Sequence, residues 1–103
     1  MTPNKNYDRG TRLEYKIKAF LEAEGYYVMR AAGSHGPADL IAIGGETCLA
    51  IQVKRHTVGR SMRGYDKLLE IPAAPWLKRQ VWTWELRSEF PTVLWSEGEE
   101  LYV

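Results

Sequence analysis

Three polar residues that could hold a divalent ion beside a phosphate interrupt an otherwise apolar part of the sequence. Asp39 precedes one apolar run, which ends at Ile43, and Gln52 and Lys54 close a second run that begins at Thr47. Carboxylate and amide oxygens are acceptable ligands for Mg²⁺ or Mn²⁺, and an ammonium group offsets negative charge on a phosphate. Together the three residues predict metal-assisted phosphodiester chemistry. Taken singly, each could instead be a loop cap or a solvated strand end.

The two apolar runs predict a β-hairpin, which would position these groups. With a turn at residues 44–45, the antiparallel register places Asp39 opposite Ala50 and makes Gln52 its diagonal neighbour on the same face. Diagonal neighbours lie roughly 7–8 Å apart, and the period of two puts Lys54 on that face as well. The hairpin therefore predicts an acid, an amide and an amine that point one way.

An amphipathic helix is expected to begin near Tyr7 or Asp8 and to end at Gly25. Glu14 lies at the edge of its apolar stripe and faces the core, where a carboxylate needs a partner. One interpretation is a capping box in a helix that begins at Arg12. The other is a functional carboxylate that the helix holds beside the hairpin.

The remaining pattern predicts a single domain over residues 1–103, with residues 1–6 as a flexible arm. Further expected elements are a strand over 26–32, a short helix within 65–73, an alternating strand from Lys78 and a strand over 92–95. The four tryptophans could stack on bases, but the spacing of two between Trp82 and Trp84 along a strand favours a core or a dimer interface. Cys48, the only cysteine, is expected to be a small buried hydrophobic residue.

Composition bounds the function further. The chain has 103 residues, 45% hydrophobic and 26% charged, with no apolar run long enough to span a bilayer and no signal-peptide core, so we expect a cytoplasmic protein. No phosphate-binding loop of the nucleotide-hydrolase type is present, which argues against a nucleotide cofactor.

The formal net charge is only +1, but the positive excess is confined to residues 1–63, around the candidate site. A basic segment of this kind is typical of a phosphate-backbone binder, although a solvated surface is the alternative. The loop over 56–64 could close over DNA or be a plain connector, and His35 could contact DNA, carry a proton or have no role. The candidate DNA-binding residues are Arg9, Arg12, Arg30, Ser34, His35, Arg55, Arg60 and Arg63.

The arrangement of Glu14, of Gly36 to Asp39 at a strand start and of Gln52 to Lys54 on the next strand resembles the PD-(D/E)XK nuclease superfamily. Within it, about residues 7–56 look most like the archaeal-type Holliday junction resolvases, which also occur in viruses. Two residues depart from their pattern: Ala38 stands in place of Pro, and Gln52 in place of Glu. The Gln-X-Lys variant is familiar in the Mrr-like restriction branch.

The resemblance implies a restriction-endonuclease-like α/β fold with a central mixed β-sheet flanked by helices. It implies an Mg²⁺-dependent endonuclease, with Mn²⁺ as a substitute, that acts as a homodimer and resolves four-way DNA junctions by paired incisions. The alternatives are an Mrr-like restriction or repair endonuclease on duplex DNA, and a DNA-binding module that has lost catalysis. The implied catalytic residues are Glu14, Ser34, Asp39, Gln52 and Lys54, and the implied metal ligands are Glu14, Asp39, Gln52 and the Val53 carbonyl.

Overall fold

The computed structural model describes residues 5–31, 36–55 and 65–97. Its elements, in chain order, are α1 (Lys5–Ala23), β1 (Tyr27–Arg30), β2 (Leu40–Gly44), β3 (Thr47–Val53), α2 (Tyr65–Leu68), β4 (Leu77–Thr83) and β5 (Thr92–Ser96). No helix in these described ranges has the length and apolar character needed to cross a membrane.

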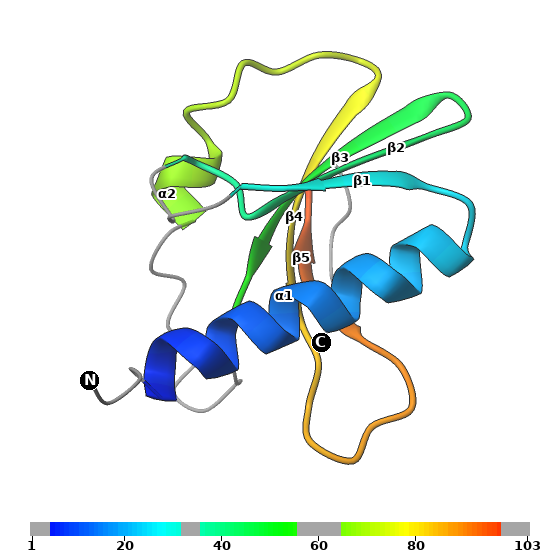
Figure 1. Cartoon of the computed structure of the whole chain (residues 1–103). Helices are drawn as coiled ribbons and strands as arrows, with labels where there is room; N and C mark the ends of the chain where they lie inside the picture. The colour runs from blue at the N-terminus through cyan, green and yellow to red at the C-terminus, as the bar shows by residue number, and fades with distance from the viewer. Residues whose placement is uncertain (1–4, 32–35, 56–64, 98–103) are drawn as a thin grey trace.

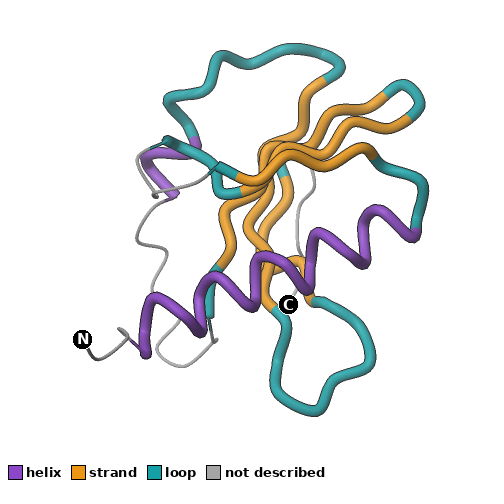
Figure 2. The backbone as a smooth tube through the Cα atoms, in the orientation of Figure 1, coloured by secondary structure: helices purple, strands orange, loops and turns teal. Residues whose placement is uncertain are grey.

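The five strands form one sheet in the order β1-β2-β3-β4-β5. β3 and β4 run parallel, and the other three pairs of neighbours run antiparallel. Helix α1 lies along one face of this sheet. The short helix α2 lies away from α1 and packs beside β3 and β4 (Figures 1 and 2). This arrangement confirms the predicted α/β fold with a central mixed sheet.

Helix α1 is held by its apolar stripe. Ile17 and Leu21 are fully buried against strand residues such as Leu40 and Ile51, and Gly25, with φ of 101°, ends the helical segment. The helix begins at Lys5, so two residues expected in the flexible arm are helical. The capping-box interpretation of Glu14 was wrong, because this residue lies well inside the helix and not in its first turn.

A second cluster fills the opposite face of the sheet, where Ala50, Leu68 and Val81 are fully buried. Cys48 packs at its border and is only half-buried, whereas we expected a buried side chain. The prediction of a core role holds for Trp82, which is 7% exposed, but Trp76 is 60% exposed. Trp76 precedes β4 and so lies outside the strand alternation on which that prediction rested.

The predicted hairpin is present, but its turn differs from the expectation. The two turn residues are Gly45 and Glu46, and Gly44 is the last residue of β2, paired with Thr47. Gly45 has φ of 50°, which a glycine adopts at little cost. Gly44 is required for another reason: a Cβ there would lie 2.6 Å from the Tyr26 ring. The expected turn at residues 44–45 was therefore wrong by one residue.

Candidate active site

The shifted turn brings the two central residues of the site closer than predicted. Leu40 pairs with Ile51, and the Asp39 amide donates to the Ile51 carbonyl at 2.8 Å, so Asp39 lies directly opposite Gln52. The prediction that Asp39 faces Ala50 was wrong, while the prediction that Asp39 and Gln52 share a face is confirmed. A register shift of two residues preserves the face, because side chains alternate with a period of two.

Hydrogen bonds fix the Asp39 carboxylate. The Gln52 side-chain amide donates to Oδ2 at 2.9 Å, and the Val53 backbone N–H donates to the same oxygen at 2.8 Å. Both of these bonds go to Oδ2, so they fix the plane of the carboxylate without using Oδ1. Asp39 is 8% exposed, so the protein holds an acid in a defined orientation at the edge of its core.

Lys54 follows on the same face of the sheet. Val53 packs towards α1, so its neighbours in the extended chain, Gln52 and Lys54, point the other way. Burial is the largest effect and raises the pKa of Asp39 above its ordinary value, against the Val53 hydrogen bond and the nearby charges of Lys54 and Arg30, which lower it. The structure thus brings the acid, the amide and the amine together.

Glu14 reaches the same end of the sheet from α1. Its Oε1 accepts a hydrogen bond from Arg30 Nε at 2.9 Å, and both side chains are 14% exposed. Burial raises the pKa of Glu14, and the nearby charge of Asp39 raises it further, against the effect of Arg30. Arg30 also lies over the Tyr15 ring, 4.7 Å from its centroid. Two carboxylates therefore share a partly buried region with Arg30 beside them.

The chemistry of this donor set fits a hard divalent ion. Each of two neighbouring carboxylates makes ionisation of the other less favourable, and a cation bound between them offsets this repulsion. The Val53 N–H points towards Asp39, and a strand residue directs its carbonyl to the same side, so this carbonyl faces the site as well. No three His, Cys, Asp or Glu side chains cluster as a metal site within residues 5–31, 36–55 and 65–97, so an ion here would need the amide or carbonyl oxygen.

A small groove with basic residues is lined by α1 and by the segments that follow β3 and β4. It has a volume of about 260 Å³ and is lined by Arg12, Leu13, Lys16, Arg55, Trp84, Glu85 and Leu86. The Lys16 ammonium lies 4.4 Å from the centroid of a Trp84 ring, and Leu86 is 90% exposed. We name this feature the basic groove. Three cations against one carboxylate give it a positive balance.

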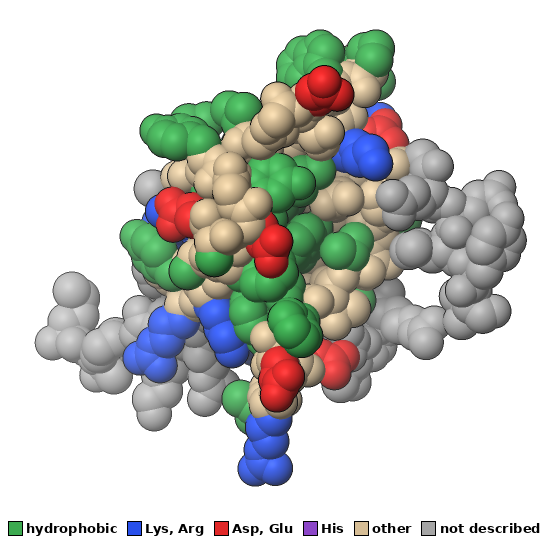
Figure 3. Space-filling model, turned by 90° about the vertical axis from the view of Figure 1, so that its right-hand side faces the viewer, with side chains coloured by type: hydrophobic (Ala, Val, Ile, Leu, Met, Phe, Trp, Pro, Cys, Tyr) green, Lys and Arg blue, Asp and Glu red, His purple; other side chains and the backbone are tan. Residues whose placement is uncertain are grey.

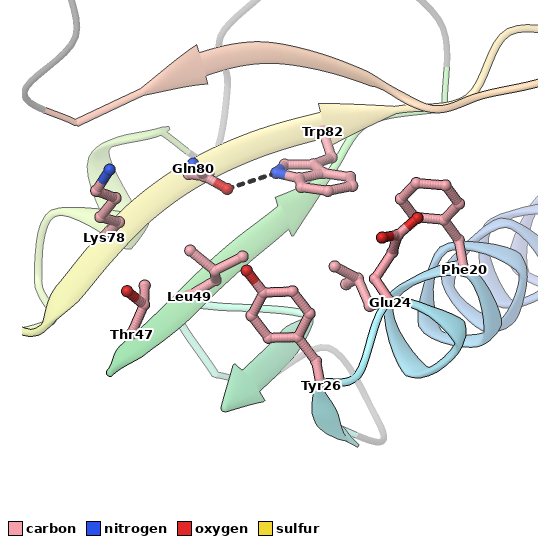
Figure 4. A pocket seen from close by; sticks show the side chains of 9 residues that line it. Phe20, Glu24, Tyr26, Thr47, Leu49, Lys78, Gln80 and Trp82 are labelled. Carbon is pink, nitrogen blue, oxygen red and sulfur yellow. Dashed lines mark hydrogen bonds between the residues drawn. The ribbon is translucent and has the colours of Figure 1, made fainter. Parts of the chain in front are cut away.

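A larger hollow of about 600 Å³ lies at the other end of β3, near Thr47 (Figure 4). Phe20 borders it from α1 and Glu24 from the turn after α1, and Lys78 and Trp82 border it from β4. Its one carboxylate and one ammonium balance in charge. The hollow therefore lacks the positive excess that a phosphate would favour, and it is separate from the Asp39 site.

Several predicted residues cannot be placed beside this site. Ser34, His35, Arg60, Arg63 and the loop over 56–64 lie outside the described residues, as does the end of the chain from residue 98. Arg9 belongs to α1, but its side chain is not described.

Sequence reasoning missed the pairing of Arg30 with Glu14. The strand alternation carried the signal, because Val28 is buried against α1 and residue 30 must share its face. It also missed Trp84 as a lining residue of the basic groove, for which the sequence gives no local signal.

The fold and the site together define a class of protein. The mixed sheet is the α/β architecture that the sequence resemblance implied, and it sets Asp39 opposite Gln52, with Lys54 two residues later. The profile described as archaeal Holliday junction resolvase (hjc) matches residues 5–61. The chain belongs to the archaeal Holliday junction resolvase family, and the family indicates a nuclease.

A solved structure supports the fold independently. The structure of Archaeoglobus fulgidus Hjc, a Holliday junction resolvase from an archaeal hyperthermophile, matches with a TM-score of 0.62 and 24% sequence identity. The match covers 78% of this chain and 70% of that chain. None of the curated proteins compared with the sequence matches it.

Proposed function

We propose that this nuclease resolves four-way DNA junctions by paired, Mg²⁺-dependent incisions on opposing strands. Family membership supports the junction as substrate. The observation that carries the catalytic part is the Asp39 carboxylate, oriented through Oδ2 by Gln52 and Val53, with Lys54 on the same face. The site thus presents an oriented acid oxygen and a cationic group to one phosphodiester.

Each residue has a proposed role at that phosphodiester. Asp39 Oδ1, the Val53 carbonyl, the Gln52 amide oxygen and Glu14 would hold the ion. A divalent ion bound there would supply charge stabilisation on the phosphate and a more acidic water. Lys54 orients the attacking water or stabilises charge that develops on the phosphate oxygens, and Arg30 holds Glu14 at the site between turnovers.

The direct test is cleavage of a labelled, mobile four-way junction, with products sized on a denaturing gel. We expect paired nicks with Mg²⁺ or Mn²⁺ and none with EDTA. A linear duplex of the same sequence separates the proposal from an Mrr-like duplex nuclease, which the Gln-X-Lys motif would suit. Junction binding without any cutting in Mn²⁺ would instead identify a DNA-binding module.

Gln52→Glu should change how the protein responds to metal. The variant loses the amide donor to Asp39 and places two carboxylates directly opposite each other, so we expect its Tm in EDTA to fall. Mg²⁺ should restore the Tm, and half-maximal cutting should need about tenfold less Mg²⁺, because one more negative charge faces the ion. Titrations of Mg²⁺ against Tm and against cleavage measure both effects.

Gln52→Met is the matched control, since it keeps the side-chain length but has neither the donor nor the ligand oxygen. It should show no metal-dependent rise in Tm beyond that of the wild type. A Gln52→Glu protein that folds and binds the junction but never cuts would show that the amide does something other than hold the ion.

The basic groove is the proposed contact for the sugar-phosphate backbone of a junction arm. On the side of the molecule at the right of Figure 1, acidic and basic side chains are interspersed around a hydrophobic centre (Figure 3). On that side, the described residues form no concentrated positive surface. The groove is lined by Arg12, Lys16 and Arg55. In the sequence, Arg12 is close to Glu14, and Arg55 directly follows Lys54.

The double variant Arg12→Gln, Lys16→Gln should weaken junction binding and reduce the dependence of log Kd on log salt by about two. Its cutting rate at saturating protein should stay within about threefold of wild type, because neither side chain is proposed to touch the reacting phosphate. Lys18→Gln is the control: Lys18 lies on the same helix but pairs with Glu22 at 2.8 Å. An unchanged salt dependence in the double variant would remove the groove from the DNA contact.

Paired incisions require two sites related by a two-fold axis, so we propose a homodimer. Tyr27, Met29 and Ile43 are all at least 45% exposed and lie together on the face of β1 and β2 that α1 does not cover. We expect a dimer by light scattering and a monomer for Ile43→Glu, which places a charge in this face. Phe90→Glu, at an exposed site on the β4–β5 loop, should remain a dimer.

A further inference from the structure

Leu86, at 90%, is the most exposed large hydrophobic side chain among the residues that the structure describes. It lies on the loop between β4 and β5, which projects from the body of the molecule at the bottom of Figure 1. A single exposed leucine is common on protein surfaces, so exposure alone indicates nothing. Two further observations distinguish Leu86: the backbone that carries it and the surface beside it.

A hydrogen-bonded turn carries Leu86. The Ser88 N–H donates to the Glu85 carbonyl at 3.0 Å, which closes a four-residue turn with Leu86 and Arg87 at its two central positions. Arg87 has φ of 72°, close to the value that a type II turn requires at its second central position. A residue other than glycine adopts this conformation at a cost, so the surrounding structure must hold the turn.

Trp84 supplies that support. Its indole Nε1 donates to the Ser88 carbonyl at 2.8 Å, at the far end of the turn. Its ring contacts two side chains of α1: Phe20 meets it edge-on, with centroids 5.7 Å apart, and the Lys16 ammonium lies 4.4 Å from a ring centroid. The turn is therefore anchored to α1 through one aromatic side chain, and Leu86 is presented at a defined place beside the helix.

The turn lies at the end of the sheet that carries Lys54. β3 and β4 run parallel, and the Lys54 amide donates to the Trp82 carbonyl, so the segments after both strands leave the sheet at the same end. Leu86 is four residues beyond Trp82, a span of at most about 14 Å. It lines the basic groove together with Arg12 and Arg55. One groove thus combines an exposed apolar side chain with cations that can bind phosphates.

We propose that Leu86 is an apolar wedge that enters the base stack at the centre of the four-way junction, while the cations of the basic groove hold the phosphates of the adjoining arm. This inference rests on the proposed function. An apolar side chain that enters DNA separates neighbouring base pairs, at the cost of their stacking. At the centre of a junction the stack of each arm is already interrupted, so a wedge breaks less stacking there than in a continuous duplex. Leu86 therefore favours branched over linear DNA.

Leu86→Gln removes the wedge and should leave the fold intact, with a Tm within about 1 °C of wild type, because the side chain is almost fully exposed. In EDTA, which prevents cutting, we expect its Kd for the junction to rise by about tenfold and its Kd for a linear duplex of the same sequence to change by less than about twofold. Leu86→Met keeps an apolar side chain of similar volume and should bind the junction within about threefold of wild type.

Phe90→Gln is the matched control. Phe90 is 66% exposed on the same loop, but it is not one of the residues that line the basic groove. The variant should bind the junction and the linear duplex as the wild type does.

A fluorescent base reports the wedge without any cutting. Aminopurine brightens when it loses a stacking neighbour, so we place it in the base pair next to the branch point. Its fluorescence should rise when the wild type binds in EDTA and stay unchanged when saturating Leu86→Gln binds. The same base in the middle of an arm should not respond to either protein.

An equal rise in fluorescence with both proteins would overturn the wedge, even if the wild type resolves junctions. So would a loss of binding in Leu86→Gln that the junction and the linear duplex share. A dimeric wild type with a monomeric Leu86→Gln, measured by light scattering, would instead make Leu86 a dimer contact and overturn the proposal too. Conversely, a rise that requires Leu86, in a wild type that never cuts with Mg²⁺ or Mn²⁺, would contradict the proposed function alone.

Discussion

Asp39→Asn is expected to yield a folded protein that binds four-way junctions but does not cut them. The asparagine can still accept hydrogen bonds from the Gln52 amide and the Val53 N–H through its one oxygen, so the local geometry should persist. It replaces the charged Oδ1 with a neutral donor, which cannot help to hold a divalent ion. We expect cleavage to fall by at least about 10³-fold, as for other groups that stabilise a transition state electrostatically. Gel assays of binding and cutting on one junction measure both.

The same variant should be more stable than wild type at neutral pH in EDTA. Burial holds the pKa of Asp39 above its ordinary value of 3.8, so ionisation is more costly in the folded protein than in the unfolded chain. Wild-type stability therefore decreases as the pH rises through the raised pKa, and the penalty is fully present above it. Below the ordinary value the carboxyl is protonated in both states. The difference in Tm between variant and wild type should accordingly close as the pH falls towards about 4.

Asp66→Asn is the matched control for this pair of effects, because Asp66 is exposed on α2. It should cut at the wild-type rate and show a Tm within about 1 °C of wild type at each pH, since surface substitutions change stability little. An Asp39→Asn protein with full cleavage would remove Asp39 from the mechanism. An Asp39→Asn protein less stable than wild type at pH 7 would show that the carboxylate contributes to folding.

Lys54→Met should give the second large loss of cutting. Methionine keeps an unbranched stem of similar length but removes the ammonium that lies near Asp39 and that we propose acts on the phosphate. We expect the single-turnover rate to fall by about 10²–10³-fold, while the junction Kd changes by less than about threefold, because the proposed backbone contacts lie in the basic groove. Single-turnover cleavage and a binding titration in EDTA separate the two quantities.

Lys67→Met is the control for the loss of one lysine charge, since Lys67 is exposed on α2. It should be indistinguishable from wild type in both assays. If Lys54→Met cut within twofold of wild type, neither the proposed water-orienting role nor the charge-stabilising role could stand. Loss of junction binding in parallel with cutting would instead make Lys54 a phosphate contact.

The Gln-X-Lys motif gives these predictions a common basis. In this structure the Gln52 amide nitrogen orients Asp39 by a hydrogen bond, a role that a glutamate could not fill. Turning the amide by 180° would present its oxygen to an ion, at the expense of that bond. Gln52 can therefore orient the Asp39 carboxylate in the metal-free protein and serve as a weak metal ligand in the metal-bound protein.

Much of the site followed from the sequence, because its determinants are local. Alternation with a period of two put Gln52 and Lys54 on one face of their strand, and any even shift of the hairpin register keeps Asp39 on that face; the helical period turned Glu14 towards the core. The strands over 40–44 and 47–53 and the first helix followed from apolar runs and their glycine boundaries. These patterns depend on neighbours within a few positions, so they can be recognised without the rest of the chain.

Only the tertiary structure decided how these groups meet. The register depended on which residues turned the chain: the structure turns at Gly45 and Glu46, and it sets Gly44 against the Tyr26 ring, a contact from outside the hairpin. The pairing of Arg30 with Glu14 required α1 to pack on β1. The parallel contact of β3 with β4 brought the turn that carries Leu86 to the Lys54 end of the sheet across a long connection. Side-chain direction is a local property, whereas partners from distant segments are selected by packing over the whole domain.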